Sequence, residues 1–182
     1  MLYFAYGSNM LSLRLQRRVA SARPLGRAFL SGYRLRFDKR SWSDASGKAR
    51  PQATGRGPDR LWGVVFEMAA SDFPALDHAE GLGKGYRRAE VQVEDTSGAV
   101  SRTFLYEAQR SHLEPALSPF VWYRDLVLAG ALEHALPRPY VHRLAAVPAQ
   151  PDRDAERCRR GREILAAAGW PEEKIKKMIS QG

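Results

Sequence analysis

The chain has 182 residues, of which 29 are Lys or Arg and 20 are Asp or Glu, and its net charge is +9. This length suits one compact domain, or one domain with a terminal appendage, and a hydrophobic content of 44% excludes a mainly disordered chain. A single cysteine excludes an internal disulfide and a zinc site built from Cys pairs. Because no segment has the roughly 18 apolar residues of a membrane span, and none resembles a secretory signal, we expect a soluble, cytoplasmic protein.

The positive charge is concentrated in the first third of the chain, where residues 1–60 contain 13 basic and 3 acidic side chains. Such a segment can attract an anionic ligand or a nucleic acid. However, its arginines are spread over several predicted elements and are not interleaved with aromatic residues. We therefore expect no nucleic-acid partner. No membrane partner is expected either, and we expect a monomer or a homodimer.

The chain begins with a strand, a turn and a helix. Residues 2–5 are apolar enough for a short buried strand, and Gly-Ser-Asn follows as a tight turn. A helix is predicted over residues 10–18, with Asn9 as its N-cap. Residues 29–37 alternate between apolar and polar positions, which predicts one half-buried strand.

Residues 42–60 are rich in Gly, Ser, Asp, Pro and Arg, which predicts a long loop. Residues 61–68 are nearly all apolar and predict another buried strand. A short helix follows, which Ser71 caps and Gly81 ends. Two further strands, residues 87–94 and 102–107, are joined by a Thr-Ser-Gly turn that fits a hairpin.

Helices dominate the rest of the chain. Ser118 and Pro119 open a predicted helix that ends near Leu136, and residues 139–146 and 151–168 predict two more before a short final helix. Strands come first and helices later, so the predicted class is α+β, with a small curved mixed sheet closing into a barrel-like core with flanking helices. We expect one domain over residues 1–148 and a helical C-terminal extension over 149–182 that packs on it.

Several chemistries have no motif in this chain. A phosphate-binding GxxxxGK[ST] loop is absent, and the glycines of residues 81–85 follow a helix rather than a strand, which is the wrong context for a dinucleotide loop. The four histidines never occur four residues apart, and both HExxH and GxSxG are missing. We therefore expect no cofactor and no metal.

Two segments can carry chemistry. The first is FAYGSN, Phe4 to Asn9, where a glycine at a strand end allows successive backbone N–H groups to converge on an anion. A simple turn, with Gly7 for backbone freedom, explains the same residues. The second is LDHAEG, where Glu80 occupies the last turn of its helix and Asp77 adds like charge. The helix dipole disfavours a carboxylate there by up to about 1 kcal/mol, so Glu80 is either a site residue or an exposed surface glutamate.

Together, these segments resemble the γ-glutamylcyclotransferase family, which includes the plant AIG2-like proteins. FAYGSNM is similar to the family's xxYGSN[LM] signature, and LDHAEG is similar to its L-[DE]-x-x-E-G element. Further similarity lies in residues 47–49, 61–66 and 86–93 and between Ser118 and Ala131. The resemblance covers roughly residues 2–146, and the arginine-rich tail beyond Pro148 has no counterpart in it.

The resemblance implies a cofactor-free ring closure. The α-amine of a γ-glutamyl group attacks its own γ-amide carbonyl, which yields 5-oxoproline and a free amine. In this family the glutamate matched by Glu80 is the catalytic acid and base, which moves a proton from the α-ammonium to the leaving amine. The resemblance also implies substrate-binding residues at Tyr3, Phe4, Ala5, Tyr6, Gly7, Ser8, Asn9 and Tyr123. Buried packing alone explains Tyr123 equally well.

The identity of the leaving amine is open at this level. The 42–60 segment and the tail are the expected walls of its pocket, and the arginines of that segment point weakly to an acidic leaving group. One alternative is a non-catalytic member of the same fold that binds a small molecule or an acidic partner. A buried Glu80 argues against this alternative, because an unused buried carboxylate is destabilising. Another alternative, an amide hydrolase that uses Ser8, lacks a base at a recognisable spacing.

Overall fold

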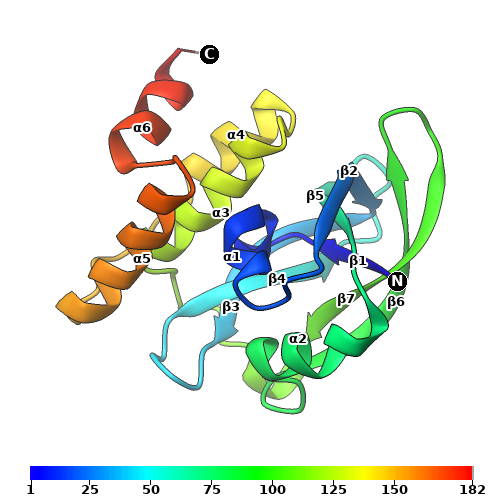
Figure 1. Ribbon diagram of the computed structural model, residues 1–182, viewed down its shortest axis with the longest axis horizontal. Helices are drawn as coiled ribbons and strands as arrows, with labels where there is room; N and C mark the ends of the chain where they lie inside the picture. The colour runs from blue at the N-terminus through cyan, green and yellow to red at the C-terminus, as the bar shows by residue number, and fades with distance from the viewer. Residues whose placement is uncertain (182) are drawn as a thin grey trace.

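The computed structural model describes residues 1–181, and its centre is a closed five-stranded barrel (Figure 1). The strand order is β1 (Leu2–Ala5), β5 (Arg60–Glu67), β2 (Arg23–Ser31), β6 (Tyr86–Asp95) and β7 (Val100–Ala108). Strand β1 runs antiparallel to β5 and parallel to β7, and this parallel pairing closes the barrel. The predicted α+β class with a barrel-like sheet is confirmed, as are the strands expected at 2–5 and 61–68 and the β6–β7 hairpin.

The alternating segment 29–37 is not one strand, so this prediction is wrong. Strand β2 ends at Ser31, and β3 (Tyr33–Arg40) leaves the barrel after a turn at Gly32, whose φ of +76° favours glycine. The Gly32 N–H donates to the Asp59 carbonyl at 2.8 Å, which fixes the turn. Phe29 on β2 and Tyr33, Leu35 and Phe37 on β3 keep the same period of two on both sides of the turn, so the pattern itself showed no sign of the break.

The predicted long loop 42–60 is also corrected, because it contains β4 (Gly47–Ala53). Strand β4 pairs antiparallel with β3 in a separate two-stranded sheet. Its Gly, Pro, Lys and Ala residues are poor strand formers, and the hydrogen bonds from β3 outweigh that local preference. The register shifts between Arg36 and Lys39, which is a bulge that buries three consecutive residues, Phe37, Asp38 and Lys39.

The first helical segment is shorter than predicted. A 3-10 turn, η1 (Ser8–Met10), precedes the five-residue helix α1 (Ser12–Gln16). Leu11, not Asn9, is the N-cap of α1, because the Asn9 side chain is used elsewhere. Helix α2 (Phe73–Glu80) follows η2 (Ala70–Asp72), so Ser71 makes no cap, and α2 ends as predicted at Gly81 with φ of +69°.

The remaining helices form one layer beside the barrel, whereas α2 lies apart from them (Figure 1). After η3 (Arg110–His112), helix α3 (Val121–Glu133) begins after Phe120, so Pro119 is not its first residue. Helices α4 (Arg138–Ala145), α5 (Ala155–Ala167) and α6 (Glu172–Ser180) all pack on α3. No helix within residues 1–181 is long and apolar enough to span a membrane.

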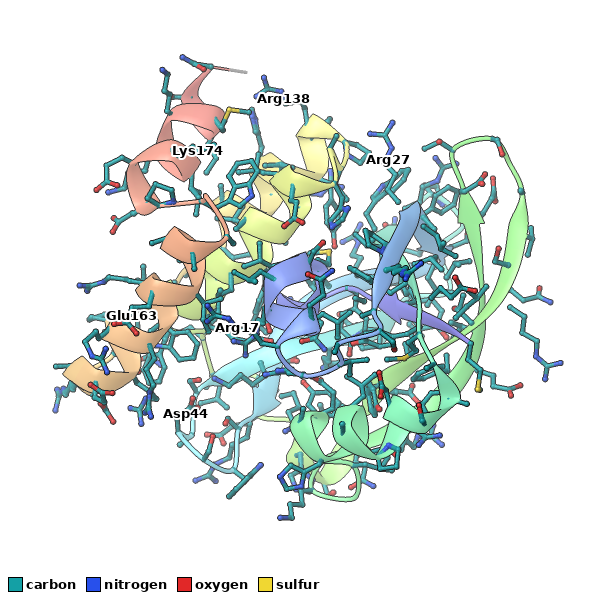
Figure 2. All side chains as sticks on the ribbon, viewed as in Figure 1. Arg17, Arg27, Asp44, Arg138, Glu163 and Lys174 are labelled. Atoms are coloured by element: carbon teal, nitrogen blue, oxygen red, sulfur yellow. The ribbon has the colours of Figure 1, made fainter. Side chains whose placement is uncertain are left out.

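Helices α5 and α6 are held by specific contacts. The Asp154 side chain caps α5 by accepting the Arg157 N–H at 2.9 Å, and Arg138 of α4 donates to the Met178 carbonyl of α6 at 3.0 Å. Charged side chains of these helices, such as Glu163 and Lys174, point away from the barrel (Figure 2). That residues 149–182 form an extension distinct from a 1–148 domain stays a prediction.

Candidate active site

The turn after β1 presents backbone N–H groups without partners. Gly7, Ser8 and Asn9 donate no backbone N–H hydrogen bond within residues 1–181, although Ser8 and Asn9 are buried. Buried N–H groups are nearly always paired, so unpaired groups that line a cavity are suited to a ligand. A side chain at Gly7 would place a Cβ 3.0 Å from the Cβ of Ala49, so glycine at this position allows the turn to lie close to β4.

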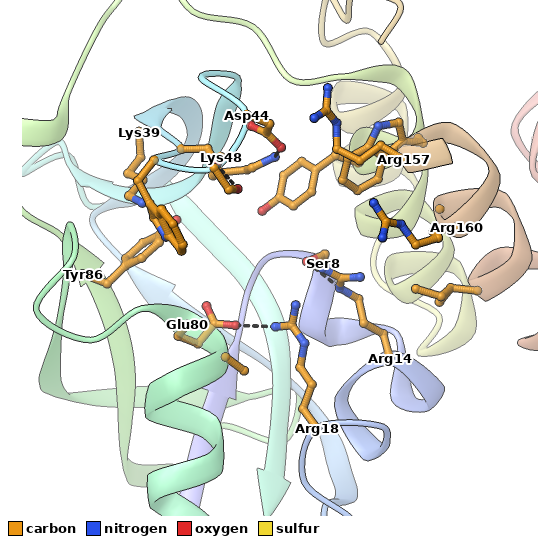
Figure 3. Close-up of a pocket in the computed structure, with 18 residues that line it drawn as sticks. Ser8, Arg14, Arg18, Lys39, Asp44, Lys48, Glu80, Tyr86, Arg157 and Arg160 are labelled. Carbon is orange, nitrogen blue, oxygen red and sulfur yellow. Dashed lines mark hydrogen bonds and ion pairs between the residues drawn. The ribbon is translucent and has the colours of Figure 1, made fainter. Parts of the chain in front are cut away.

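Glu80 faces this turn across the cavity (Figure 3). Its Oε1 atom accepts from Asn9 Nδ2 at 2.9 Å and from Arg18 Nη1 at 2.7 Å. Arg18 Nη1 also donates to Asn9 Oδ1 at 2.9 Å, so the three side chains form one network. In the part of the chain that the structure describes, Oε2 of Glu80 has no partner. Two segments separated by 71 positions therefore meet in one site.

Asp77 does not act on Glu80 as an unpaired like charge. Arg88 Nε donates to its Oδ1 atom at 2.8 Å, and the Tyr106 hydroxyl donates to the same oxygen at 2.7 Å. The hydrogen bonds from Arg88 lower the pKa of Asp77 despite partial burial. Asp77 thereby fastens α2 to β6 and β7, and this attachment sets the position of Glu80 at the end of the helix.

Tyrosine hydroxyls make up much of the inner wall. The Ala49 N–H donates to the Tyr123 hydroxyl at 3.2 Å, and the Tyr86 hydroxyl donates to the Ala49 carbonyl at 2.7 Å. Burial is the main cause that raises the pKa of Tyr3, Tyr6, Tyr86 and Tyr123, so all four stay neutral at physiological pH.

Two cavities adjoin at these residues. The inner one has a volume of about 30 Å³ and is enclosed by the turn, the tyrosines and Glu80. The outer one has a volume of about 400 Å³ and also includes residues of β3, β4, the segment between them, α3 and α5 (Figure 3). Ser8, Glu80, Tyr86 and Tyr123 line both cavities. A ligand can thus place a small group inside and a larger group outside.

The structure brings most of the predicted site residues together. Those that line the inner cavity are Tyr3, Tyr6, Gly7, Ser8, Asn9, Glu80 and Tyr123. Phe4 and Ala5 line neither cavity and are fully buried in the core, where Phe4 packs against Gly63. Side chains alternate along β1, and this alternation turns Phe4 away from the site.

Sequence reasoning missed Arg14, Arg18, Lys39 and Tyr86. Arg14 Nε donates to Ser8 Oγ at 3.1 Å, and burial followed by the nearby Arg18 lowers its pKa to about 9, which leaves it cationic at neutral pH. Arg14 and Arg18 lie four positions apart, which places them on one face of the helix predicted over residues 10–18. That spacing was the available signal. In the structure α1 ends at Gln16, and Arg18 lies in the turn that follows it.

Nothing in the sequence marks Lys39, which lies at the bulge of β3. Tyr86 is the first residue of β6 and belongs to a segment of family similarity, but no local pattern predicts that it lines the site.

The site has no arrangement for a metal ion, since no group of three or more His, Cys, Asp and Glu side chains up to Gln181 is suited to hold one. Its elements are a carboxylate, a set of free amide N–H groups and a ring of neutral phenols. This combination suits proton transfer next to a stabilised carbonyl oxygen.

Known proteins resemble this chain in sequence and in fold. Residues 60–144 match the model of the AIG2-like family. The chain is 33% identical over 156 residues to a γ-glutamylcyclotransferase of Homo sapiens, with 80% of this chain and 78% of the relative covered. A γ-glutamylcyclotransferase of Bos taurus is 32% identical over 154 residues, with the same coverage of 80% and 78%.

A solved structure of a γ-glutamyl cyclotransferase superposes with a TM-score of 0.75 at 29% identity and covers 100% of this chain and 99% of that one. The structural similarity therefore extends through α5 and α6, beyond the residues that the sequence motifs cover. The chain belongs to the γ-glutamylcyclotransferase family.

Proposed function

We propose that the chain converts a γ-glutamyl amino acid, peptide or amine into 5-oxoproline and the free amine, with Glu80 as the general acid and base. The observation that carries this proposal is the meeting of the Glu80 carboxylate with the free amide N–H groups of Gly7, Ser8 and Asn9 around one cavity. The reaction requires both features in one place, and it requires no covalent enzyme intermediate.

The proposed reaction is intramolecular. Glu80 accepts a proton from the substrate α-ammonium, and the resulting amine attacks the γ-carbonyl carbon to close a five-membered ring. The unpaired Oε2 atom is the one available for this proton, since Asn9 and Arg18 both donate to Oε1. The proton then passes from Glu80 to the leaving nitrogen as the amide C–N bond breaks. The ring nitrogen gives up its second proton, so 5-oxoproline keeps one N–H and the released amine leaves as an ammonium ion. Orientation of two groups in one molecule supplies an effective molarity on the order of 10⁵ M or more.

The turn after β1 would stabilise negative charge during this reaction. Charge develops on the carbonyl oxygen as the ring closes, and the substrate α-carboxylate is charged throughout. Amide N–H groups that are already in place stabilise such charge without reorganisation. The small inner cavity holds the reacting atoms, and the outer cavity receives the amine that leaves.

The test is to incubate the protein with a panel of γ-glutamyl amides and to measure 5-oxoproline by mass spectrometry. Glu80→Gln keeps the shape of the side chain but removes its proton transfer, so release of 5-oxoproline should fall by roughly 10²-fold or more. Glu90→Gln, which alters an exposed residue of β6, is the matched control and should keep full activity. Near-wild-type turnover by Glu80→Gln would remove Glu80 from the mechanism. Binding without any 5-oxoproline would favour the non-catalytic alternative.

A further inference from the structure

The outer cavity is bounded by positively charged side chains from three parts of the chain. Lys39 and Lys48 come from β3 and β4, Arg14 and Arg18 from the segment after the turn, and Arg157 and Arg160 from α5 (Figure 3). Among the described residues, two carboxylates line the same cavity, Asp44 and Glu80. Because this cavity opens directly from the inner one, its walls surround the part of a substrate that leaves as the amine.

Three of these six cations have close carboxylate partners. Arg18 pairs with Glu80 at 2.7 Å, and Lys48 pairs with Asp44 at 2.7 Å. Arg157 is bound by Asp152, whose side chain is fully buried, through Nη2 and Oδ1 at 2.7 Å. These pairs hold the walls in place.

The other three cations, Arg14, Lys39 and Arg160, lack such a partner. Within residues 1–181, neither Arg14 nor Lys39 has a carboxylate oxygen within 4.0 Å. The bulge in β3 turns Lys39 into the cavity, where its Nζ atom lies 4.3 Å from the centre of the Tyr86 ring and the residue is only 3% exposed. For Arg160 the nearest carboxylate is Glu156 at 4.0 Å, and Glu156 pairs more closely with Arg159 at 2.6 Å.

The outer cavity thus has more cations without close partners than a simple γ-glutamyl amino acid needs. In the proposed reaction, the turn after β1 binds the carboxylate of the γ-glutamyl group, so a simple leaving amino acid brings one carboxylate to the outer cavity. Three cations without close partners there match a leaving group with a second carboxylate, and a buried lysine such as Lys39 is stabilised when it gains an anionic partner. We propose that the outer cavity selects γ-glutamyl conjugates whose leaving amine is an acidic amino acid. This inference rests on the proposed function and adds the substrate class to it.

The source of the charge differs from the sequence expectation. The arginines of the 42–60 segment, which pointed weakly to an acidic leaving group, are Arg50, Arg56 and Arg60, and none of them lines the cavity. Arg50 instead donates through Nη2 to Asp38 at 2.9 Å. The segment and the tail do form walls of the cavity, through Trp42 and Lys48 on one side and α5 on the other.

The experiment compares γ-glutamyl-glutamate with γ-glutamyl-glutamine, which has nearly the same shape and one charge fewer. We expect kcat/KM to be about tenfold higher for γ-glutamyl-glutamate at low salt, which corresponds to about 1.4 kcal/mol. The preference should shrink as salt is added, because ions screen the exposed Arg160.

Two variants test whether the cations of the outer cavity cause this substrate preference. Arg160→Gln, at an exposed position where folding is not at risk, should lower kcat/KM severalfold more for γ-glutamyl-glutamate than for γ-glutamyl-glutamine, and so reduce the preference. Combining it with Lys39→Gln should reduce the preference further. The matched control is Arg162→Gln, because Arg162 lies on the same helix but lines a different cavity, and it should keep the preference.

The outcomes separate this inference from the proposed function. Equal kcat/KM for the two substrates, together with clear turnover of γ-glutamyl-alanine, would overturn the inference alone. A preference that both variants leave intact would also overturn it. Absence of 5-oxoproline from every substrate would overturn both the inference and the proposed function.

Discussion

Tyr123 lies where the two cavities join, and its hydroxyl has two tasks. It accepts the Ala49 N–H at 3.2 Å, and in the proposed reaction it faces the substrate. Burial raises the pKa of Tyr123, so the hydroxyl keeps its proton at neutral pH. The same hydroxyl therefore stabilises the β4 backbone and forms part of the cavity wall.

We expect Tyr123→Phe to lower kcat/KM for a γ-glutamyl amide by roughly tenfold, because one polar contact to the reacting group is lost. The variant should also lose about 1 kcal/mol of stability, since the buried Ala49 N–H loses its acceptor. Steady-state kinetics and chemical denaturation measure the two effects.

Tyr140→Phe is the control for this variant. Tyr140 is equally buried, and its hydroxyl donates to the Trp62 carbonyl at 3.2 Å, away from both site cavities. We expect a similar loss of stability with unchanged kinetics. If both variants lost activity to the same degree, a direct contact between Tyr123 and the substrate would be contradicted.

At the scale of the elements, α3 supports the turn that carries the free N–H groups. The point of closest approach is Gly130, where an added Cβ would lie 2.5 Å from the Leu11 nitrogen and 2.6 Å from the Met10 carbonyl carbon. These are backbone atoms, which cannot rotate away as a side chain can. The turn and Asn9 therefore keep their distance from Glu80 only while position 130 has no side chain.

We expect Gly130→Ala to cost about 1–3 kcal/mol of stability, because overpacking forces α3 and η1 apart. The displacement should also lower kcat/KM, since Asn9 moves relative to Glu80. Gly57→Ala is the control, because nothing lies within 4 Å of its added Cβ and Gly57 does not require a positive φ. Full activity of Gly130→Ala at unchanged stability would show that α3 does not position the turn.

At the scale of the whole molecule, the carboxylate of Asp152 connects two helices of the helical layer, α3 and α5. Asp152 accepts Trp122 Nε1 of α3 at 2.9 Å and Arg157 Nε of α5 at 2.7 Å. The hydrogen bonds from Arg157 are the main cause that lowers the pKa of Asp152. Since α5 supplies two of the cavity's cations, this carboxylate also holds the outer wall in place.

Because of this connection, the free energy of unfolding depends on pH. The pKa of Asp152 is lower in the folded chain than in the unfolded chain, so the unfolded chain binds protons first as the pH falls. The free energy of unfolding should therefore fall once the pH drops below about 4, the usual pKa of an aspartate. Denaturation curves at several pH values measure this slope. Asp152→Asn should be less stable at neutral pH and should show a shallower loss in acid, so parallel curves would contradict this role.

The local features of this protein could be predicted from its amino-acid sequence. Apolar runs predicted β1 and β5, Gly81 predicted the end of α2, and the turn at Gly7 and the position of Glu80 singled out the two halves of the site. These features depend on a few neighbouring residues, because backbone conformation, helix ends and hydrophobic periodicity are local properties.

Only the tertiary structure decided which side chains complete the site. Gly32 divides an uninterrupted alternation, β4 forms because β3 lies beside it, and a bulge turns Lys39 into the cavity. Arg18 reaches Glu80 across 62 positions, and α5 closes the outer wall from the far end of the chain. Such contacts depend on how distant elements pack, so a local sequence pattern cannot predict which residues will be in contact.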